Sequence, residues 1–180
     1  MSAEIEKKLM IRQARIDELE DIVTFYGEVI EQQKSKEYGV KWSLDVYPTR
    51  QDLASALEAG EMHVGTLGGR IACAAKMTGN SEIYNDISWP TEVPEEDVSV
   101  IHLLAVHGDF SGMGFAKELV AYFADLSRKL GRKVIRLDVL KENLPAERLY
   151  LKCGFRFVAE KKIFYEDTGL VDFRMFELVL

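Results

Sequence analysis

A run of small residues in the middle of the sequence separates an apolar strand from a helix. The run consists of Ser111, Gly112, Met113, Gly114, Phe115 and Ala116. Its small residues let the backbone approach a ligand closely, and several N–H groups point the same way where a helix begins. Such a nest of amides, reinforced by the helix dipole, binds phosphate without a charged side chain. The run therefore predicts an anion site, with a plain glycine turn into the helix as the alternative.

Two other phosphate-binding loops do not fit this run. A P-loop requires Gly-Lys-Ser/Thr after a four-residue gap, and the sequence has none. A dinucleotide fingerprint requires a third glycine at the position that Lys117 occupies. The loop also lacks the paired carboxylates that hold Mg²⁺ in nucleoside-triphosphate enzymes, so we exclude that class.

A second segment lies downstream, with Asn143, Ala146, Leu149, Tyr150, Gly154 and Phe155 in fixed order. Together the two segments resemble the GNAT superfamily, which carries Q/R-x-x-G-x-G/A and then N-x-x-A-x-x-L/F-Y-x-x-x-G-F. The match in order and spacing covers roughly residues 98–158. Ile101–Val106 and Ile135–Asp138 also resemble a bacterial acetyltransferase subgroup with I-H-x-L-A-V before the loop and I-R-L-D after it.

The resemblance implies acetyl-CoA as cosubstrate and no metal. Leu104, Ala105 and Val106 would offer backbone groups to the pantetheine arm and the thioester carbonyl, and residues 111–116 would hold the pyrophosphate. Asn143 would hydrogen-bond the pantetheine arm, although an Asn close before a proline also suits a helix N-cap.

The chain departs from the family pattern at one position of the phosphate loop. Ser111 stands where the family usually has Arg or Gln, which would add a hydrogen bond to the pyrophosphate. We therefore expect phosphate binding to depend on the backbone amides and on Lys117.

Acetyl transfer to an amine requires a base for the amine proton and an acid for the departing thiolate. By resemblance Tyr150 is the acid, although a core tyrosine would occupy the same helix face. His102 and Asp138 are candidate bases if their side chains share a face, with Glu142 as a third candidate. Strand alternation places His102 on the side of Leu104 unless a bulge intervenes. A hydrogen-bonded core histidine and a structural aspartate are the alternatives.

Aromatic residues in two loops are candidates for binding the acceptor amine. Trp42 and Tyr47 lie in one loop, and Tyr84 and Trp89 lie in another. Aromatic faces attract cations, so these side chains can line an amine pocket. The alternative is that they anchor long loops to the core.

The elements that position these residues follow from the hydrophobic pattern. Strands are predicted at Leu9–Arg15, Met62–Leu67, Ile71–Met77, Val98–Val106, Val134–Leu140, Phe155–Phe164 and Val171–Leu178. Helices are predicted from Asp17, from Thr49 to near Gly60, from the glycine-rich turn to Gly131, and from Asn143 to Cys153.

This order predicts an α+β mixed sheet in a single domain spanning residues 1–180. The resemblance implies the GNAT-like acyl-CoA N-acyltransferase fold, with a central mixed sheet of about seven strands flanked by four helices. The last strand, Val171–Leu178, is expected at a sheet edge where a homodimer can pair.

Composition narrows the class of protein. Of the 180 residues, 47% are hydrophobic and 29% charged, as in ordinary soluble domains. A net charge of −7 argues against a nucleic-acid partner. The charged start, Met1–Met10, lacks the apolar core of a signal peptide, and no apolar run approaches the ~18 residues of a membrane span. We expect a cytoplasmic protein with no membrane partner.

The cysteines and the remaining histidines carry no predicted chemistry. Cys73 and Cys153 are expected to be buried free thiols. His63 and His107 are expected at the surface or at strand ends, and the three histidines lack metal-ligand spacing.

Two functions remain open from the sequence. The first is an N-acetyltransferase that moves an acetyl group from acetyl-CoA to a primary amine of a small molecule or a protein, by direct transfer in a ternary complex. The alternative is a non-catalytic sensor or regulatory module that binds acetyl-CoA.

Overall fold

The computed structural model describes residues 8–166 and 168–180. The charged start of the chain, on which the prediction against a signal peptide depends, therefore lies mostly outside the described residues. Among the helices that are described, none combines the length and the apolar character needed to cross a membrane.

Strands and helices follow one another in the predicted order. The strands are β1 (Met10–Gln13), β2 (Met62–Leu67), β3 (Arg70–Thr78), β4 (Val98–Val106), β5 (Val134–Leu140), β6 (Arg156–Tyr165) and β7 (Gly169–Val179). The main helices are α1 (Leu19–Gln33), α2 (Arg50–Glu58), α3 (Phe115–Lys129) and α4 (Leu144–Lys152). The predicted mixed sheet with four flanking helices is confirmed.

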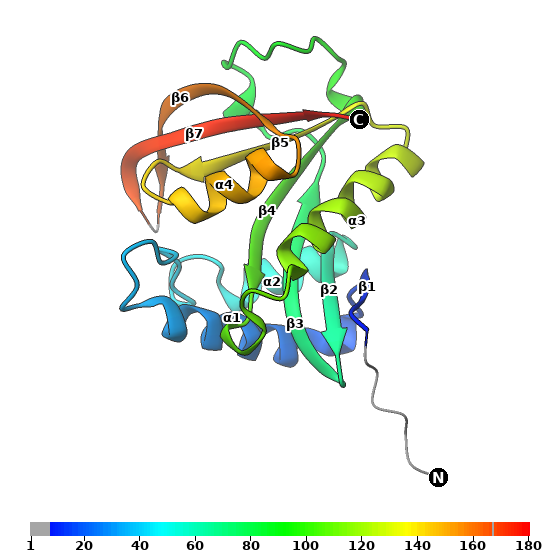
Figure 1. The fold of residues 1–180 in the computed structure, drawn as a ribbon, viewed down its shortest axis with the longest axis vertical. Coiled ribbons are helices and arrows are strands. Elements are labelled where there is room, and N and C mark those ends of the chain that lie inside the picture. The colour runs from blue at the N-terminus through cyan, green and yellow to red at the C-terminus, as the bar shows by residue number, and fades with distance from the viewer. Residues whose placement is uncertain (1–7, 167) are drawn as a thin grey trace.

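The strands form one sheet in the order β1-β2-β3-β4-β5-β7-β6 (Figure 1). The β4–β5 pair is parallel, and the other neighbours are antiparallel. The expectation that the last strand forms an edge is wrong. β7 pairs with β5 on one side and with β6 on the other, so both rows of its backbone groups are already used.

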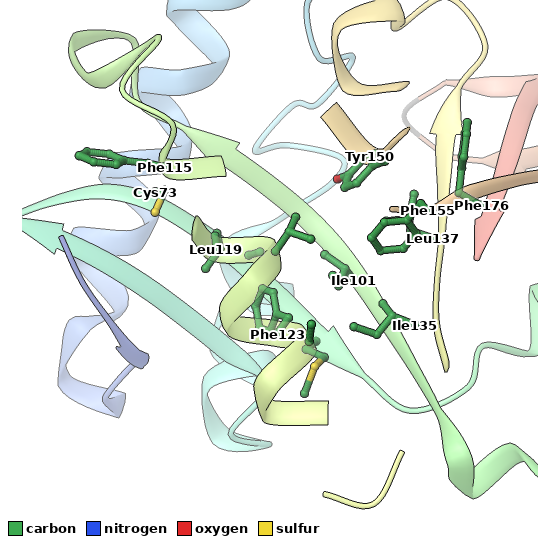
Figure 2. Close-up of a cluster of buried hydrophobic side chains, with 14 of the residues drawn as sticks. Cys73, Ile101, Phe115, Leu119, Phe123, Ile135, Leu137, Tyr150, Phe155 and Phe176 are labelled. Atoms are coloured by element: carbon green, nitrogen blue, oxygen red, sulfur yellow. The ribbon is translucent and has the colours of Figure 1, made fainter. Parts of the chain in front are cut away.

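Helices cover both faces of the sheet (Figure 1). Helices α3 and α4 pack on one face around a cluster that includes Leu119, Phe123 and Tyr150, and Cys73 lies in the same cluster (Figure 2). Helices α1 and α2 pack on the other face, where Tyr26 and Leu53 are fully buried. The sheet core is therefore enclosed from both sides, as its apolar central strands require.

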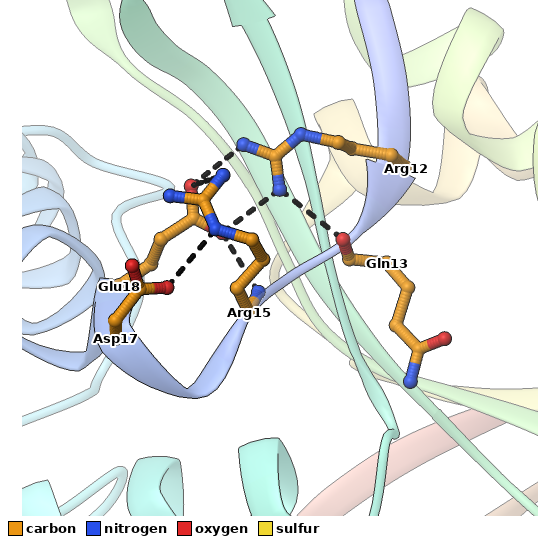
Figure 3. A network of polar contacts seen from close by, with 5 residues as sticks. All are labelled: Arg12, Gln13, Arg15, Asp17 and Glu18. Atoms are coloured by element: carbon orange, nitrogen blue, oxygen red, sulfur yellow. Dashed lines mark hydrogen bonds and ion pairs between the residues drawn. The ribbon is translucent and has the colours of Figure 1, made fainter.

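A polar network attaches the edge strand β1 to the start of α1 (Figure 3). The Glu18 carboxylate accepts two hydrogen bonds from the Arg12 guanidinium, at 2.8 and 2.6 Å, and one from the backbone N–H of Arg15 at 2.7 Å. The hydrogen bond from Arg12 is the main reason that the pKa of Glu18 falls to about 2. The network fixes where α1 begins.

A buried ion pair lies where β4 and β5 are last paired. Arg136 of β5 donates from Nε to Glu177 of β7 at 3.0 Å, and the two side chains are 7% and 0% exposed. Arg136 also donates to the Thr91 carbonyl at 2.9 Å. Its guanidinium carbon lies 4.3 Å from the centre of the Trp89 ring. The pair thus joins the central sheet to the loop between β3 and β4.

We predict that Arg136→Met destabilises the fold by about 3–5 kcal/mol, because Glu177 is left buried without its cation. Arg136→Met combined with Glu177→Met should recover most of that loss, since no charge then remains in the core. Urea unfolding of the two variants and the wild type measures both effects. A single variant as stable as the wild type would contradict this account.

Candidate active site

The central cleft opens because β4 and β5 separate. Their pairing runs from Val98 opposite Val134 to Val100 opposite Arg136 and then ends. Beyond this point β4 stays with β3 while β5 stays with β7, and Figure 1 shows the two strands diverging. The backbone groups that face each other across the gap are therefore open to a ligand.

A pocket occupies this gap, with about 930 Å³ of empty space that includes the part open to solvent. One wall is the segment of β4 from Ile101 to Leu104, and the facing wall is the end of β5 from Asp138 to Leu140. The loop after α1, helix α4 and the β6–β7 hairpin complete it.

A bulge redirects β4 within the pocket. Leu103 has φ = 56°, and the β3–β4 register shifts between Ala74 and Lys76. As a result Leu103 packs with the α1–α2 cluster, whereas Leu104 packs with the α3 cluster. Regular alternation along β4 predicts that His102 and Leu104 share a face of the sheet. The bulge at Leu103 interrupts this alternation, so the two side chains no longer share a face.

Tyr26 supports the bulge from α1. Its buried hydroxyl donates a hydrogen bond of 2.8 Å to the Leu103 carbonyl. A non-glycine residue in the left-handed region costs of order 1–3 kcal/mol, and such strain persists where the surroundings fix it. Tyr26 is a positioning residue that the sequence analysis missed, since nothing local links it to a strand far downstream.

The glycine-rich loop leads into α3 without a side-chain cap. Gly112 and Gly114 have φ values of 79° and 85°, and Gly114 is the N-cap of α3. Within the described residues, the backbone amides of Gly112, Gly114, Phe115 and Ala116 donate to no protein acceptor. Four amides around a helix N-terminus fit a phosphate group, which supports the anion site expected from the sequence.

The segment before this loop is held by α1. The Gln32 Oε1 atom accepts from the Gly108 N–H at 2.8 Å, and Gln32 Nε2 lies 3.0 Å from His107 Nε2. A Cβ at Gly108 would lie 2.7 Å from that Oε1 atom, so a larger residue there would displace the Gln32 side chain. His107 is 4% exposed and follows β4 directly. His107 therefore lies at a strand end, as expected, but its side chain is buried rather than at the surface.

His63 is expected at the surface or at a strand end; it is the second residue of β2, and only the expected surface position is wrong. It lies within β2, is 5% exposed, and its Nδ1 lies 3.0 Å from the Tyr122 hydroxyl. Burial lowers its pKa to about 4. No group of His, Cys, Asp or Glu side chains that could hold a metal ion occurs in the described part of the chain.

Helix α4 presents Asn143 and Tyr150 to the pocket. Asn143 is the N-cap, and its Oδ1 accepts from the Ala146 N–H at 3.2 Å, which leaves its amide nitrogen for a ligand. The Tyr150 ring packs edge-on against Phe155. Its hydroxyl makes no hydrogen bond with the described residues, and burial raises its pKa, with the Asp138 charge adding to the effect.

His102 and Asp138 both line the pocket, yet the contacts of His102 in the described chain do not include Asp138. The Thr78 hydroxyl donates to the Gly79 carbonyl at 2.9 Å, so it accepts from His102 Nε2 at 3.0 Å. This arrangement leaves His102 Nδ1 with a lone pair. Burial, and then the nearby Lys76 charge, lowers the pKa of His102 to about 4, so the ring is neutral near pH 7.

The four aromatic candidates separate into two groups. Trp42 and Tyr47 line the pocket. Tyr84 and Trp89 do not line the pocket. Tyr84 is 1% exposed, and Trp89 Nε1 donates a hydrogen bond of 3.0 Å to the Tyr84 carbonyl. These two residues anchor their loop to the sheet, so the structure places them behind the pocket wall rather than in it.

Two aromatic residues of the pocket were not predicted from the sequence. Tyr165 and Phe173 line the pocket from β6 and β7, with ring centres 5.1 Å apart. Period-two alternation in the last hairpin could have suggested that they share a face. Only the tertiary arrangement brings that face to β4.

The fold and the open cleft define an acyl-CoA N-acyltransferase. Residues 19–155 match the model of the Acetyltransferase (GNAT) family, and the chain belongs to that family. It is therefore an acyltransferase. An uncharacterized N-acetyltransferase, MJ1207 of Methanocaldococcus jannaschii, is 31% identical over 70 residues. That match covers 39% of this chain and only 31% of the relative's length.

Solved structures share the fold. A GNAT-family acetyltransferase from Streptococcus agalactiae superposes with a TM-score of 0.76 at 20% identity, over 97% of each chain. The putative acetyltransferase yncA of Salmonella typhimurium, solved with its cofactor acetyl-CoA, has a TM-score of 0.71 at 17% identity. The match covers 97% of this chain and 95% of that chain.

We predict that Gly114→Ala weakens acetyl-CoA binding at least tenfold, because alanine at φ = 85° forces the loop to move its amides. Gly131→Ala is the matched control. Gly131 follows the other end of α3, has φ = 76°, and likewise has open space around a new Cβ. Calorimetry should show near-native affinity for Gly131→Ala, with similar losses of thermal stability in both variants. Equal affinities would contradict the assignment.

The lowered pKa of His102 makes a prediction about stability. Between pH ~6.5 and ~4 the unfolded chain binds a proton at this residue and the folded chain does not. The free energy of unfolding should therefore fall as the pH is lowered through this window, by roughly 3 kcal/mol from this group. His102→Gln should reduce the dependence of the unfolding free energy on pH. Part of that dependence should remain, because the pKa of His63 is also lowered to about 4. Parallel curves for variant and wild type would contradict the shift.

Proposed function

We propose that the protein transfers an acetyl group from acetyl-CoA to a primary amine of a small molecule or a protein, directly between the two bound reactants. The observation that carries this proposal is the cleft between β4 and β5, whose pocket contains titratable side chains, together with four backbone amides at the start of α3 that donate to no acceptor in the described part of the chain. Acetyl-CoA would supply an activated acyl group as a thioester.

The cofactor half of the site would bind through the backbone. Residues 111–116 would hold the pyrophosphate with their amides, as the uncapped start of α3 supports. Ser111 and Lys117 are exposed beside this loop. Burial raises the pKa of the Cys153 thiol, and the nearby Lys117 charge partly offsets this effect. Leu104, Ala105 and Val106 would pair with the pantetheine arm along the open side of β4.

The acceptor half would bind through side chains. Asp138 would attract the protonated amine, and the rings of Trp42 and Tyr47 would surround it. The amine would first lose one proton to solvent, and His102 Nδ1 would take a second proton as the neutral nitrogen attacks the thioester carbonyl. Because His102 is neutral near pH 7, it can act as this base without first losing a proton.

Tyr150 would give its hydroxyl proton to the sulfur as the carbon–sulfur bond breaks. A phenol with a raised pKa is a weaker acid than a thiol, so the proton must move together with bond breaking. The protonated His102 can then restore the proton of Tyr150 through solvent, and neither residue is changed over the cycle.

We predict that Tyr150→Phe lowers kcat by about 10²-fold or more, because the thiolate then departs without its proton donor. The dissociation constant for acetyl-CoA should change by less than about threefold, since the ring and its packing are kept. A thiol-release assay over a panel of amines measures kcat, and calorimetry measures binding. Wild-type binding without turnover on any amine would favour the sensor hypothesis instead.

A further inference from the structure

The loop between β3 and β4, residues 79–97, is attached to the sheet at three points. The Tyr84 hydroxyl donates a hydrogen bond to the Asp138 Oδ1 atom. Lys161 of β6 donates to the Ile83 carbonyl at 3.2 Å and forms an ion pair with Asp86. The Trp89 ring lies against Arg136, as described above. The loop is thus fixed to β5 through Asp138 and Arg136 and to β6 through Lys161, and of these strand residues only Asp138 lines the pocket.

Tyr84 is suited to hold a carboxylate in place. It is 1% exposed, and its ring packs against Trp89 with centres 5.5 Å apart, so the hydroxyl position is set by the core. Burial raises the pKa of Tyr84 well above its usual value, so this hydroxyl keeps its proton and donates it to Asp138. A hydrogen bond to a charged acceptor is stronger than a neutral one, and it restricts the carboxylate.

Asp138 meets the pocket with its other oxygen. The Tyr165 hydroxyl, which belongs to the pocket, lies 3.5 Å from Asp138 Oδ2. Among the described residues, the titratable groups around Asp138 include Tyr84 behind it and Tyr150, Tyr165 and His102 on the pocket side. One carboxylate oxygen is therefore engaged from the core, while the other is directed to the acceptor side.

We propose that Tyr84 is a positioning residue that holds the Asp138 carboxylate for the amine of the acceptor. The β3–β4 loop would then contribute to acceptor affinity without touching the acceptor. This inference rests on the proposed acetyl transfer to an amine. It deepens that function by assigning recognition of a cationic amine to Asp138 and its support to Tyr84.

The first test is Tyr84→Phe, which removes one hydroxyl and keeps the ring. With the best amine of the panel, its KM for the amine should rise about tenfold, while kcat and the acetyl-CoA dissociation constant stay within twofold. Tyr122→Phe is the matched control, because the Tyr122 hydroxyl also has one partner, His63, and lies on the α3 side of the sheet. That variant should leave the amine KM unchanged.

A double-mutant cycle separates positioning from a general structural effect. In an Asp138→Ala background the amine KM is already raised, and adding Tyr84→Phe should raise it less than twofold further. If the fold-increases in amine KM from the two substitutions multiply in the double variant, the proposal is overturned, because Tyr84 would then act independently of Asp138.

A second variant covers the case in which Tyr84→Phe folds poorly. Lys161→Ala releases the loop from β6 at a partly exposed position and should raise the amine KM about threefold with kcat unchanged. If the wild type transfers acetyl groups and both variants keep its amine KM, the proposal is overturned.

A crystal structure of Tyr84→Phe gives a readout that does not depend on turnover. We expect the Asp138 carboxylate to rotate away from its wild-type position, and an unchanged carboxylate would overturn the proposal. A wild type that releases no thiol with any amine overturns the acetyl-transfer function alone, and this structure then decides the role of Tyr84.

Discussion

The parallel pairing between β4 and β5 lasts for three residue pairs, and the rest of the site depends on where it stops. In a continuous sheet the backbone groups beyond Val100 and Arg136 would be used by the neighbouring strand. Here each strand keeps a different antiparallel partner, so the gap is bounded by rigid walls on both sides. An extended ligand with amide groups can take the place of the missing pairing, which is why the cleft suits the proposed cofactor.

Keeping the strands apart involves features that are unfavourable by themselves. Leu103 adopts a left-handed conformation, and its carbonyl depends on the buried Tyr26 hydroxyl. Arg136 and Glu177 form an ion pair in the core at the last paired position, where desolvation offsets much of the attraction. Both features fix a backbone geometry that apolar packing alone would leave unspecified.

Much of the fold was predictable because its boundaries are set locally. Thr49 begins α2 with a capping box to Asp52, and the apolar run Val98–Val106 forms β4 as expected. The placement of Tyr84 was not predictable, since its partner Asp138 comes from a strand that the sequence alone does not align with it. Burial of His63 also depends on its contacts with Tyr122 and Phe123 of α3, which no local pattern encodes.

The two halves of the site differ in how the chain encodes them. The proposed cofactor half would use backbone amides from one continuous loop, so its spacing lies in consecutive residues that a family pattern can detect. The proposed acceptor half would combine side chains such as Trp42, Asp138 and Tyr165 from separate segments, and the position of each depends on long-range packing. Changes in those segments can alter the acceptor without moving the amides of the loop. Membership of the acetyltransferase family therefore leaves the acceptor open, and on the proposed function the side chains around Asp138 would determine it.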